Sequence, residues 1–124
     1  MTRPLSATAP DPDTVLTKAA LSAAVHLGVR NRALAQIIGT SEASISRLGA
    51  ARSIASQSKE GELTLLFLRM FRSLDALVGG DQAKARAWFE SDNTHLGGIP
   101  AERVRTVEGL VDVVQYLDAV RGRL

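Results

Sequence analysis

The sequence predicts an all-α protein, and three observations indicate this class. Prolines occur only at positions 4, 10, 12 and 100, so the stretch between Asp13 and Ile99 can form uninterrupted helices. No segment alternates β-branched or aromatic residues with polar ones between turn dipeptides, which is the pattern of a strand. Glycines divide the stretch into short segments, because a helix can end there in a left-handed residue. These glycines are Gly28, Gly39, Gly49, Gly61, Gly79, Gly80, Gly97 and Gly98.

Length and composition exclude several classes of protein. A chain of 124 residues has room for one compact core or two small helical units, and is too short for a multidomain enzyme. The absence of cysteine excludes disulfides, thiolate zinc sites and cysteine nucleophiles, so we expect a cytoplasmic protein. The longest strongly apolar run, residues 65–68, is far shorter than the roughly 20 residues of a membrane span, so no membrane partner is expected.

Three short helices are predicted in the first half of the chain. Residues 1–12 are expected to be a disordered tail, because prolines stand where a signal peptide would have its apolar core. Asp13 or Thr14 can cap a helix that runs to about Leu27, and a second helix covers roughly residues 30–38. Ser41 can cap a third helix through about Leu48, and residues 49–60 are expected to be a linker of small residues.

Residues 32–48 fit a helix-turn-helix. Ala35 has the small side chain that lets two helices cross closely, and Gly39 supplies the tight turn between them. The spacing of Ala35, Gly39, Ile45 and Leu48, at offsets 0, 4, 10 and 13, resembles the Xre-type helix-turn-helix of bacterial and phage repressors. The residues expected to pack the angle between the helices are Leu34, Ile38, Ile45 and Leu48.

The outer face of the third helix carries short polar groups and one arginine, as a base-reading surface does. We expect Arg47 to contact a guanine edge, and Ser41 and Ser44 to contact bases or phosphates. Thr40 and Arg52 are expected to contact backbone phosphate. Residues 1–58 carry six basic and three acidic residues, a net charge of +3, which agrees with DNA binding only weakly. Serine and arginine on a solvated helix face usually have no specific partner, and that interpretation stays open.

In the second half of the sequence we expect one long helix and two further helices. From Leu63 onward, apolar residues recur on one face of a helix, and Leu65 and Leu68 widen that face. The width indicates burial on two sides, contact with another subunit, or simply a central core helix. A shorter helix covers Asp81 to Glu90, and a loop follows it.

The last helix is expected to start near Thr106 and to carry two apolar stripes. One stripe can pack on the helix that begins at Leu63, and the other is a candidate for a second copy or a different protein. The first stripe is Val107, Leu110, Val111, Val114 and Leu117, and the second is Val113, Tyr116 and Val120.

Residues 60–124 resemble the toxin-binding domain of the MbcA/ParS/Xre antitoxin family. The resemblance rests on Ala87-Trp88-Phe89, Asp92-Asn93, Leu96-Gly97-Gly98-Ile99-Pro100, Thr106, Gly109, Val113 and Leu117. Two departures are Asp92, where the family often has proline, and Arg103-Val104, where two apolar residues are usual. Elementary chemistry explains many of these residues as structural: Trp88 covers the core under the following loop, Asn93 bonds its own backbone in a turn, and Thr106 caps the last helix.

The resemblance implies an antitoxin of a type II toxin-antitoxin system. It implies that the chain blocks the active site of a RES-domain toxin that degrades NAD+, and represses its own operon by binding promoter DNA as a homodimer. The domains would be a helix-turn-helix over residues 13–58 and a toxin-binding domain over residues 59–124. The toxin contacts expected from the second stripe, the glycine loop and the tail are His95, Leu96, Val113, Tyr116, Val120, Arg121, Arg123 and Leu124.

No motif in the sequence predicts that this chain catalyses a reaction. The two histidines lie 69 positions apart without a carboxylate at ligand spacing, and no glycine loop has the flanking strand of a phosphate site. We therefore expect no catalytic residue, no metal and no cofactor. Two other functions stay open: a helix-turn-helix repressor whose C-terminal helices only dimerise it or sense a ligand, and an adaptor without DNA affinity.

Overall fold

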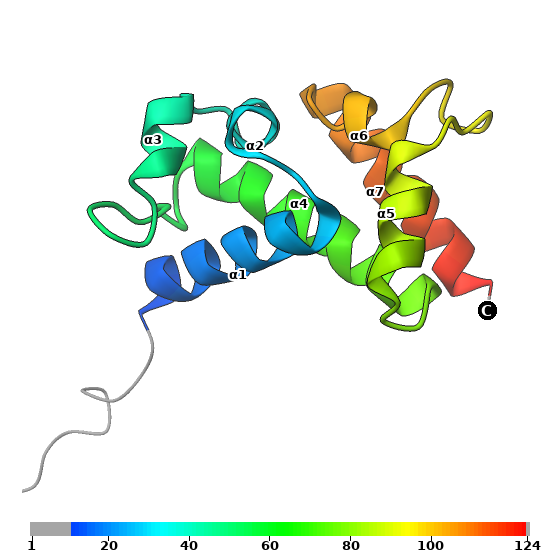
Figure 1. Ribbon diagram of the computed structural model, residues 1–124, viewed down its shortest axis with the longest axis horizontal. Helices are drawn as coiled ribbons and strands as arrows, with labels where there is room; N and C mark the ends of the chain where they lie inside the picture. Colours follow the sequence, from blue (N-terminus) through cyan, green and yellow to red (C-terminus); the bar gives the residue numbers. More distant parts are fainter. Residues whose placement is uncertain (1–10, 124) are drawn as a thin grey trace, which may run out of the picture.

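The protein is described by a computed structural model over residues 11–123, and this part of the chain is helical without a strand (Figure 1). The predicted all-α class is confirmed. The helices are α1 Pro12–Leu27, α2 Asn31–Ile38, α3 Glu42–Ser46, α4 Lys59–Leu77, α5 Gln82–Glu90, α6 Pro100–Arg103 and α7 Val107–Gly122. Most of the predicted tail, residues 1–10, lies outside the described residues.

Helix α1 begins earlier than the sequence predicts. Its N-cap is Asp11, whose carboxylate accepts a 3.1 Å hydrogen bond from the backbone N–H of Thr14. Pro12 occupies the first helical position, where its missing N–H costs nothing. Asp13 is therefore already helical, and its side chain is free for a different contact.

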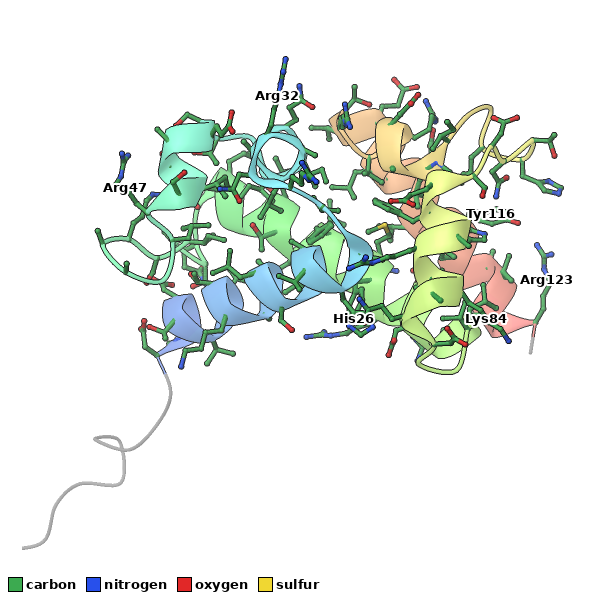
Figure 2. All side chains as sticks on the ribbon, viewed as in Figure 1. His26, Arg32, Arg47, Lys84, Tyr116 and Arg123 are labelled. Carbon is green, nitrogen blue, oxygen red and sulfur yellow. The ribbon has the colours of Figure 1, made fainter. Side chains whose placement is uncertain are left out.

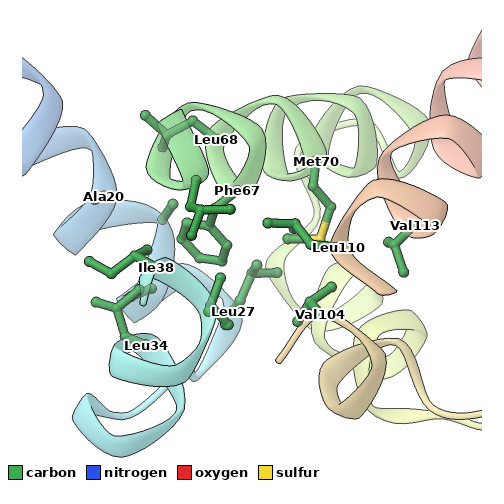
Figure 3. Close-up of a cluster of buried hydrophobic side chains, with 14 of the residues drawn as sticks. Ala20, Leu27, Leu34, Ile38, Phe67, Leu68, Met70, Val104, Leu110 and Val113 are labelled. Atoms are coloured by element: carbon green, nitrogen blue, oxygen red, sulfur yellow. The ribbon is translucent and has the colours of Figure 1, made fainter. Parts of the chain in front are cut away.

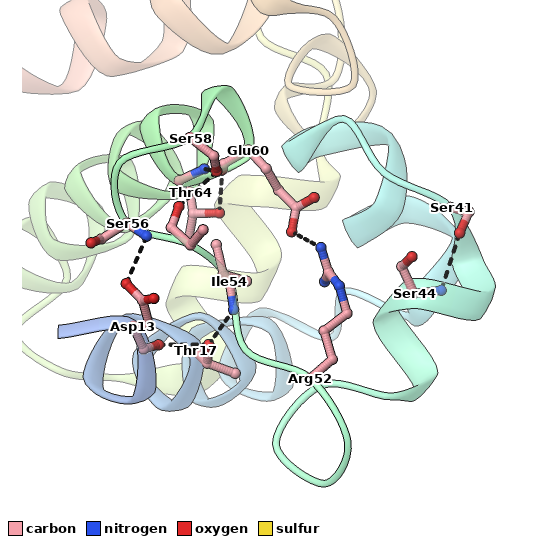
Figure 4. A network of polar contacts seen from close by, with 12 residues as sticks. Asp13, Thr17, Ser41, Ser44, Arg52, Ile54, Ser56, Ser58, Glu60 and Thr64 are labelled. Atoms are coloured by element: carbon pink, nitrogen blue, oxygen red, sulfur yellow. Dashed lines mark hydrogen bonds and ion pairs between the residues drawn. The ribbon is translucent and has the colours of Figure 1, made fainter. Parts of the chain in front are cut away.

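That contact holds the segment between α3 and α4, which is packed and not a free linker (Figure 4). The Asp13 carboxylate accepts a 2.9 Å hydrogen bond from the backbone N–H of Ser56, and this bond keeps the pKa of Asp13 below its usual value. Ile54 is fully buried, and its N–H donates a 2.7 Å bond to the Thr17 hydroxyl. The expected linker does connect α3 to α4, but Ile54 and these two hydrogen bonds fix it to α1, and its last two residues, Lys59 and Glu60, already belong to α4.

Helix α4 is the central element of the fold. It packs against α1 and α2 through one part of its surface and against α7 through another (Figure 1). Phe67 and Met70 are fully buried between these neighbours (Figure 3). Leu68 is buried as well, whereas Leu65 is 53% exposed, so the apolar face is wider than the core of one chain can cover.

Two glycines permit close approach of backbone and do not end helices. Gly61 was expected to end a helix, but it lies in the first turn of α4, where a side chain would overlap the carbonyl oxygen of Ala55. Gly109 lies in the first turn of α7, where a side chain would overlap the carbonyl oxygen of Arg103. In both places the chain that leads into the helix packs directly on it.

Helix α7 starts as predicted, but its buried face differs from the two expected stripes. The Thr106 hydroxyl caps it by accepting a 3.1 Å hydrogen bond from the N–H of Gly109. Because both α4 and α6 cover this helix, Val113 of the predicted outer stripe lies in the core beside Leu110 and Val114. The buried face therefore combines members of both expected stripes, whereas Tyr116, Val120 and Val111 are half-buried and Val107 is 59% exposed.

Candidate functional site

Helices α2 and α3 form the angle of a helix-turn-helix. Ala35 is buried where the helices cross, and Gly39 takes the left-handed conformation at φ 79° that the turn requires. Its N–H bonds to the carbonyl oxygen of Ala35 at 2.9 Å, which ends α2. All four residues predicted to pack the angle are buried: Leu34, Ile38, Ile45 and Leu48.

Helix α3 presents the polar surface that the sequence predicted, although it ends at Ser46 and not at Leu48. The Ser41 hydroxyl caps the helix by accepting a 3.1 Å hydrogen bond from the N–H of Ser44 (Figure 4). Arg47 follows as the C-cap, is exposed, and points away from the body of the molecule (Figure 2). Ser41 is exposed, and Thr40 and Ser44 are half-buried beside it.

Arg52 forms an ion pair within the chain, whereas the sequence predicts that its side chain contacts DNA. Its guanidinium lies 2.5 Å from the Glu60 carboxylate, and the two side chains are only 27% and 17% exposed. This ion pair ties the turn after α3 to the first turn of α4 (Figure 4). Arg52 therefore has a structural role that the sequence does not predict, and its contact with DNA phosphate stays a prediction.

Two arginines that the sequence interpretation did not assign are exposed at the start of α2. Arg30 is the N-cap of α2 and Arg32 lies in its first turn, and both side chains are exposed. Figure 2 shows Arg32 projecting outward from the helix-turn-helix, as Arg47 does. The basic excess of the first half included both residues, but only the fold places them on the outside of this helix pair.

The opposite end of the molecule carries three stacked rings, which we call the aromatic ladder: Trp88 of α5, Tyr116 of α7 and His95 of the loop. Trp88 and Tyr116 stack with centroids 6.3 Å apart, and His95 and Tyr116 with centroids 5.7 Å apart. Phe89, which follows Trp88 in the sequence, is buried and fills the core that Trp88 was expected to cover. Trp88 itself is half-buried. Large rings at a partly exposed surface are typical of protein interfaces.

The loop between α5 and α6 holds His95 at this surface. The Asn93 side-chain oxygen accepts hydrogen bonds from the N–H groups of His95 and Leu96, at 3.0 and 3.2 Å. Gly97 takes the left-handed conformation at φ 67°, whereas Gly98 pairs its backbone with Asn93 and does not. The predicted turn around Asn93 is confirmed.

The same turn directs Leu96 into the core, where it is buried. Two predicted toxin contacts, Leu96 and Val113, are thus core residues, only 6% and 0% exposed. His95, Arg121 and Arg123 are exposed and Tyr116 and Val120 half-buried, while Leu124 lies outside the described residues.

A hollow of about 360 Å³ lies beside the ladder and includes the ion pair of Arg103 and Asp112, whose charged atoms are 2.5 Å apart. Among residues 11–123, no three His, Cys, Asp or Glu side chains converge as a metal site would need. Within the same range, no helix has the length and apolar character needed to cross a bilayer.

Comparison with protein families assigns both halves of the chain. Residues 6–69 match the antitoxin Xre-like helix-turn-helix domain. Residues 73–123 match the antitoxin Xre/MbcA/ParS C-terminal toxin-binding domain. No curated protein matches the chain. The chain belongs to the Xre/MbcA/ParS family of antitoxins, with a helix-turn-helix domain followed by a toxin-binding domain.

Proposed function

We propose that this protein is the antitoxin of a type II system whose toxin has a RES domain and degrades NAD+. The antitoxin acts in the cytoplasm by covering the toxin's active site and performs no chemistry itself. The observation that carries the proposal is the aromatic ladder, because stacked rings stand partly exposed on the domain that matches toxin-binding domains.

The end of α7 supports a specific way of blocking the toxin. Arg121 and Arg123 are exposed at the last turn of the helix, which continues from the side of the ladder (Figure 2). We propose that residues 121–124 enter the cleft of the toxin while the ladder binds its rim. The positive charge of these residues suits a cleft that accepts a substrate with phosphate groups.

We also propose that the antitoxin binds the promoter of its own operon as a homodimer. Arg47, Ser41 and Ser44 of the recognition helix would read base edges, and Thr40 with the exposed Arg30 and Arg32 would bind phosphates. Arg47 beside the recognition helix and Tyr116 of the ladder lie toward opposite ends of the molecule (Figure 2), so one molecule has room for toxin and DNA together.

Co-expression tests this function directly. The reading frame that neighbours this one is expressed alone and together with the antitoxin, and growth and cellular NAD+ are measured. We expect loss of NAD+ with the neighbour alone and normal NAD+ with both. Arg47→Ala is the matched control, because it should lose promoter binding and still protect. A neighbour that is harmless on its own contradicts the toxin-binding role.

A repressor whose C-terminal helices only dimerise it or sense a ligand is the second candidate function. The exposed apolar side chains of Val15 and Leu65 agree with a dimer in this function as in the first, since such residues are often covered by a second subunit. An adaptor without DNA affinity is the third. If no neighbouring reading frame encodes a RES-like protein, the repressor is favoured. If the purified protein does not bind the promoter, the adaptor is favoured.

A further inference from the structure

We propose that the groove between α1 and α4 binds the same groove of a second copy, with the two α4 helices antiparallel. This inference rests on the homodimer of the proposed function and assigns it a surface. The groove has a volume of about 320 Å³ and is lined by Pro12, Val15, Leu16, Ala19, Ser56, Leu65, Leu68 and Arg72. Val15 is 47% exposed and Leu65 53% exposed, so two large apolar side chains face water along it.

The groove continues into a second hollow of about 410 Å³ that also contains Ser56 and Leu65. Glu62 lines this second hollow, and Arg72 lines the first. Lys59 lines the second hollow as well and forms a 2.8 Å ion pair with Glu62, so the strip carries this pair at one end, Leu65 in the middle and Arg72 at the other. Glu62 and Arg72 are ten residues apart on α4, which separates them by about 15 Å along the helix axis.

Glu62 of one copy and Arg72 of the other can meet in only one orientation. A two-fold axis that makes the α4 helices antiparallel places Glu62 of each copy against Arg72 of the other, and does so twice. A parallel arrangement would instead bring equal charges together. Within residues 11–123 Arg72 forms no ion pair, and Glu62 pairs only with Lys59, which is exposed to solvent.

The apolar centre fits the same symmetry. Leu65 at the rim of one groove can enter the groove of the other copy, between Val15 and Leu68, and the reverse contact follows from the two-fold axis. Arg69, in the same row of α4, is bound to Asp118 of α7 and so points away from the groove. Neither Arg47 nor the aromatic ladder lines the groove, so dimerisation leaves both surfaces accessible.

The oligomeric state of the purified antitoxin tests the inference, and neither toxin nor DNA is needed. Sedimentation equilibrium is measured for the wild type, Leu65→Asp, Glu62→Arg, Arg72→Glu and the double variant Glu62→Arg/Arg72→Glu. Val107→Asp is the matched control, because Val107 is an exposed apolar residue at the start of α7, away from the groove. Circular dichroism and thermal melting confirm that each variant is folded.

We expect a dimeric wild type and control, and a monomeric Leu65→Asp. Each single charge reversal should weaken the dimer by about tenfold or more, because two equal charges then face each other at both ends. The double variant should recover most of the wild-type affinity, since it restores both pairs with reversed sign. Failure of the double variant to recover would overturn the antiparallel register.

A monomeric wild type, or a Leu65→Asp variant that stays dimeric, would overturn the proposal as a whole. A monomeric wild type whose binding to the toxin is lost in Leu65→Asp would assign the groove to the toxin instead, and would overturn it too. Failure of the antitoxin to neutralise its neighbour contradicts only the proposed function, because sedimentation of the purified chain is measured without a toxin.

Discussion

The Arg86 side chain of α5 closes the C-terminal end of α1, where its Nε donates a 2.9 Å hydrogen bond to the carbonyl oxygen of His26. A second bond, from Nη2 to the carbonyl oxygen of Val25, is 2.7 Å long. The last carbonyl groups of a helix have no partner within the helix, so a guanidinium is well suited to bind them. Arg86 belongs to the half that matches toxin-binding domains and His26 to the half that matches the helix-turn-helix.

Replacement of Arg86 by methionine should therefore destabilise the whole chain. We expect a loss of about 1–3 kcal/mol in the free energy of unfolding, because the variant keeps the aliphatic part of the side chain and removes two charge-assisted hydrogen bonds. Urea denaturation followed by circular dichroism measures the loss. Lys84→Met on the exposed face of the same helix is the control and should be close to neutral. Equal stability of the two variants would contradict this role of Arg86.

Replacement of Arg47 by alanine should weaken promoter binding by about 1–3 kcal/mol and relax specificity at one base position. Arg32→Ala should instead weaken binding to all sequences and lower the salt dependence, because Arg32 is placed to contact phosphate. Binding isotherms at several salt concentrations separate these effects. A loss below about 0.5 kcal/mol for Arg47→Ala would favour the adaptor function.

Replacement of Tyr116 by alanine should remove the middle ring of the aromatic ladder and lower toxin affinity by about 2 kcal/mol. Tyr116→Phe keeps the ring and should keep most of the affinity. Calorimetric titration with the toxin measures both, and thermal melting shows whether the fold is intact. If Tyr116→Ala binds the toxin as tightly as the wild type, the ladder is not part of the interface.

Deletion of residues 121–124 should abolish neutralisation of the toxin without unfolding the antitoxin. The deleted residues begin in the exposed last turn of α7, beyond the buried Leu117, so the core stays complete. The measurement is NAD+ hydrolysis by the toxin in the presence of the shortened antitoxin. Unchanged protection would contradict the proposed entry of the tail into the cleft.

Acid should release the segment between α3 and α4. The pKa of Asp13 is lower in the folded chain than its usual value of 3.8, because the carboxylate accepts the Ser56 N–H bond. The stabilisation is therefore present above that value and is lost as the pH falls through the lower pKa of the folded state. Asp13→Asn should be less stable than the wild type at pH 7, and the difference should shrink toward pH 3. Thermal melting over this range measures it, and a difference independent of pH would contradict the assignment.

The local features of this fold could be predicted from the sequence because they depend on neighbouring residues. The caps of Ser41 and Thr106 and the turns at Gly39 and Asn93 are set by side chains that act within a few positions of themselves. Periodicity likewise predicts that α4 and α7 have buried faces. These contacts need no knowledge of how distant helices meet.

The contacts between distant residues could not be predicted in the same way. The ion pair of Arg52 with Glu60 could not be predicted, because Glu60 lies across a turn that the sequence represents only as small residues. Val113 was assigned to a toxin contact because periodicity gives the direction of a side chain on its helix but not the number of helices that cover it. Glycines inside a first turn, such as Gly61, look in the sequence like glycines that end a helix.

The position of α4 restricts how such antitoxins can be recombined. The match to the helix-turn-helix family ends at residue 69 and the match to the toxin-binding family begins at residue 73, so the two meet within this single helix. A chimaera joined at that point would contain an α4 whose two halves come from different parents. The core of each domain would then pack in part against a foreign half of this helix. An exchange of toxin specificity between relatives therefore has to carry α4 over intact, together with matched surfaces on α1 and α7.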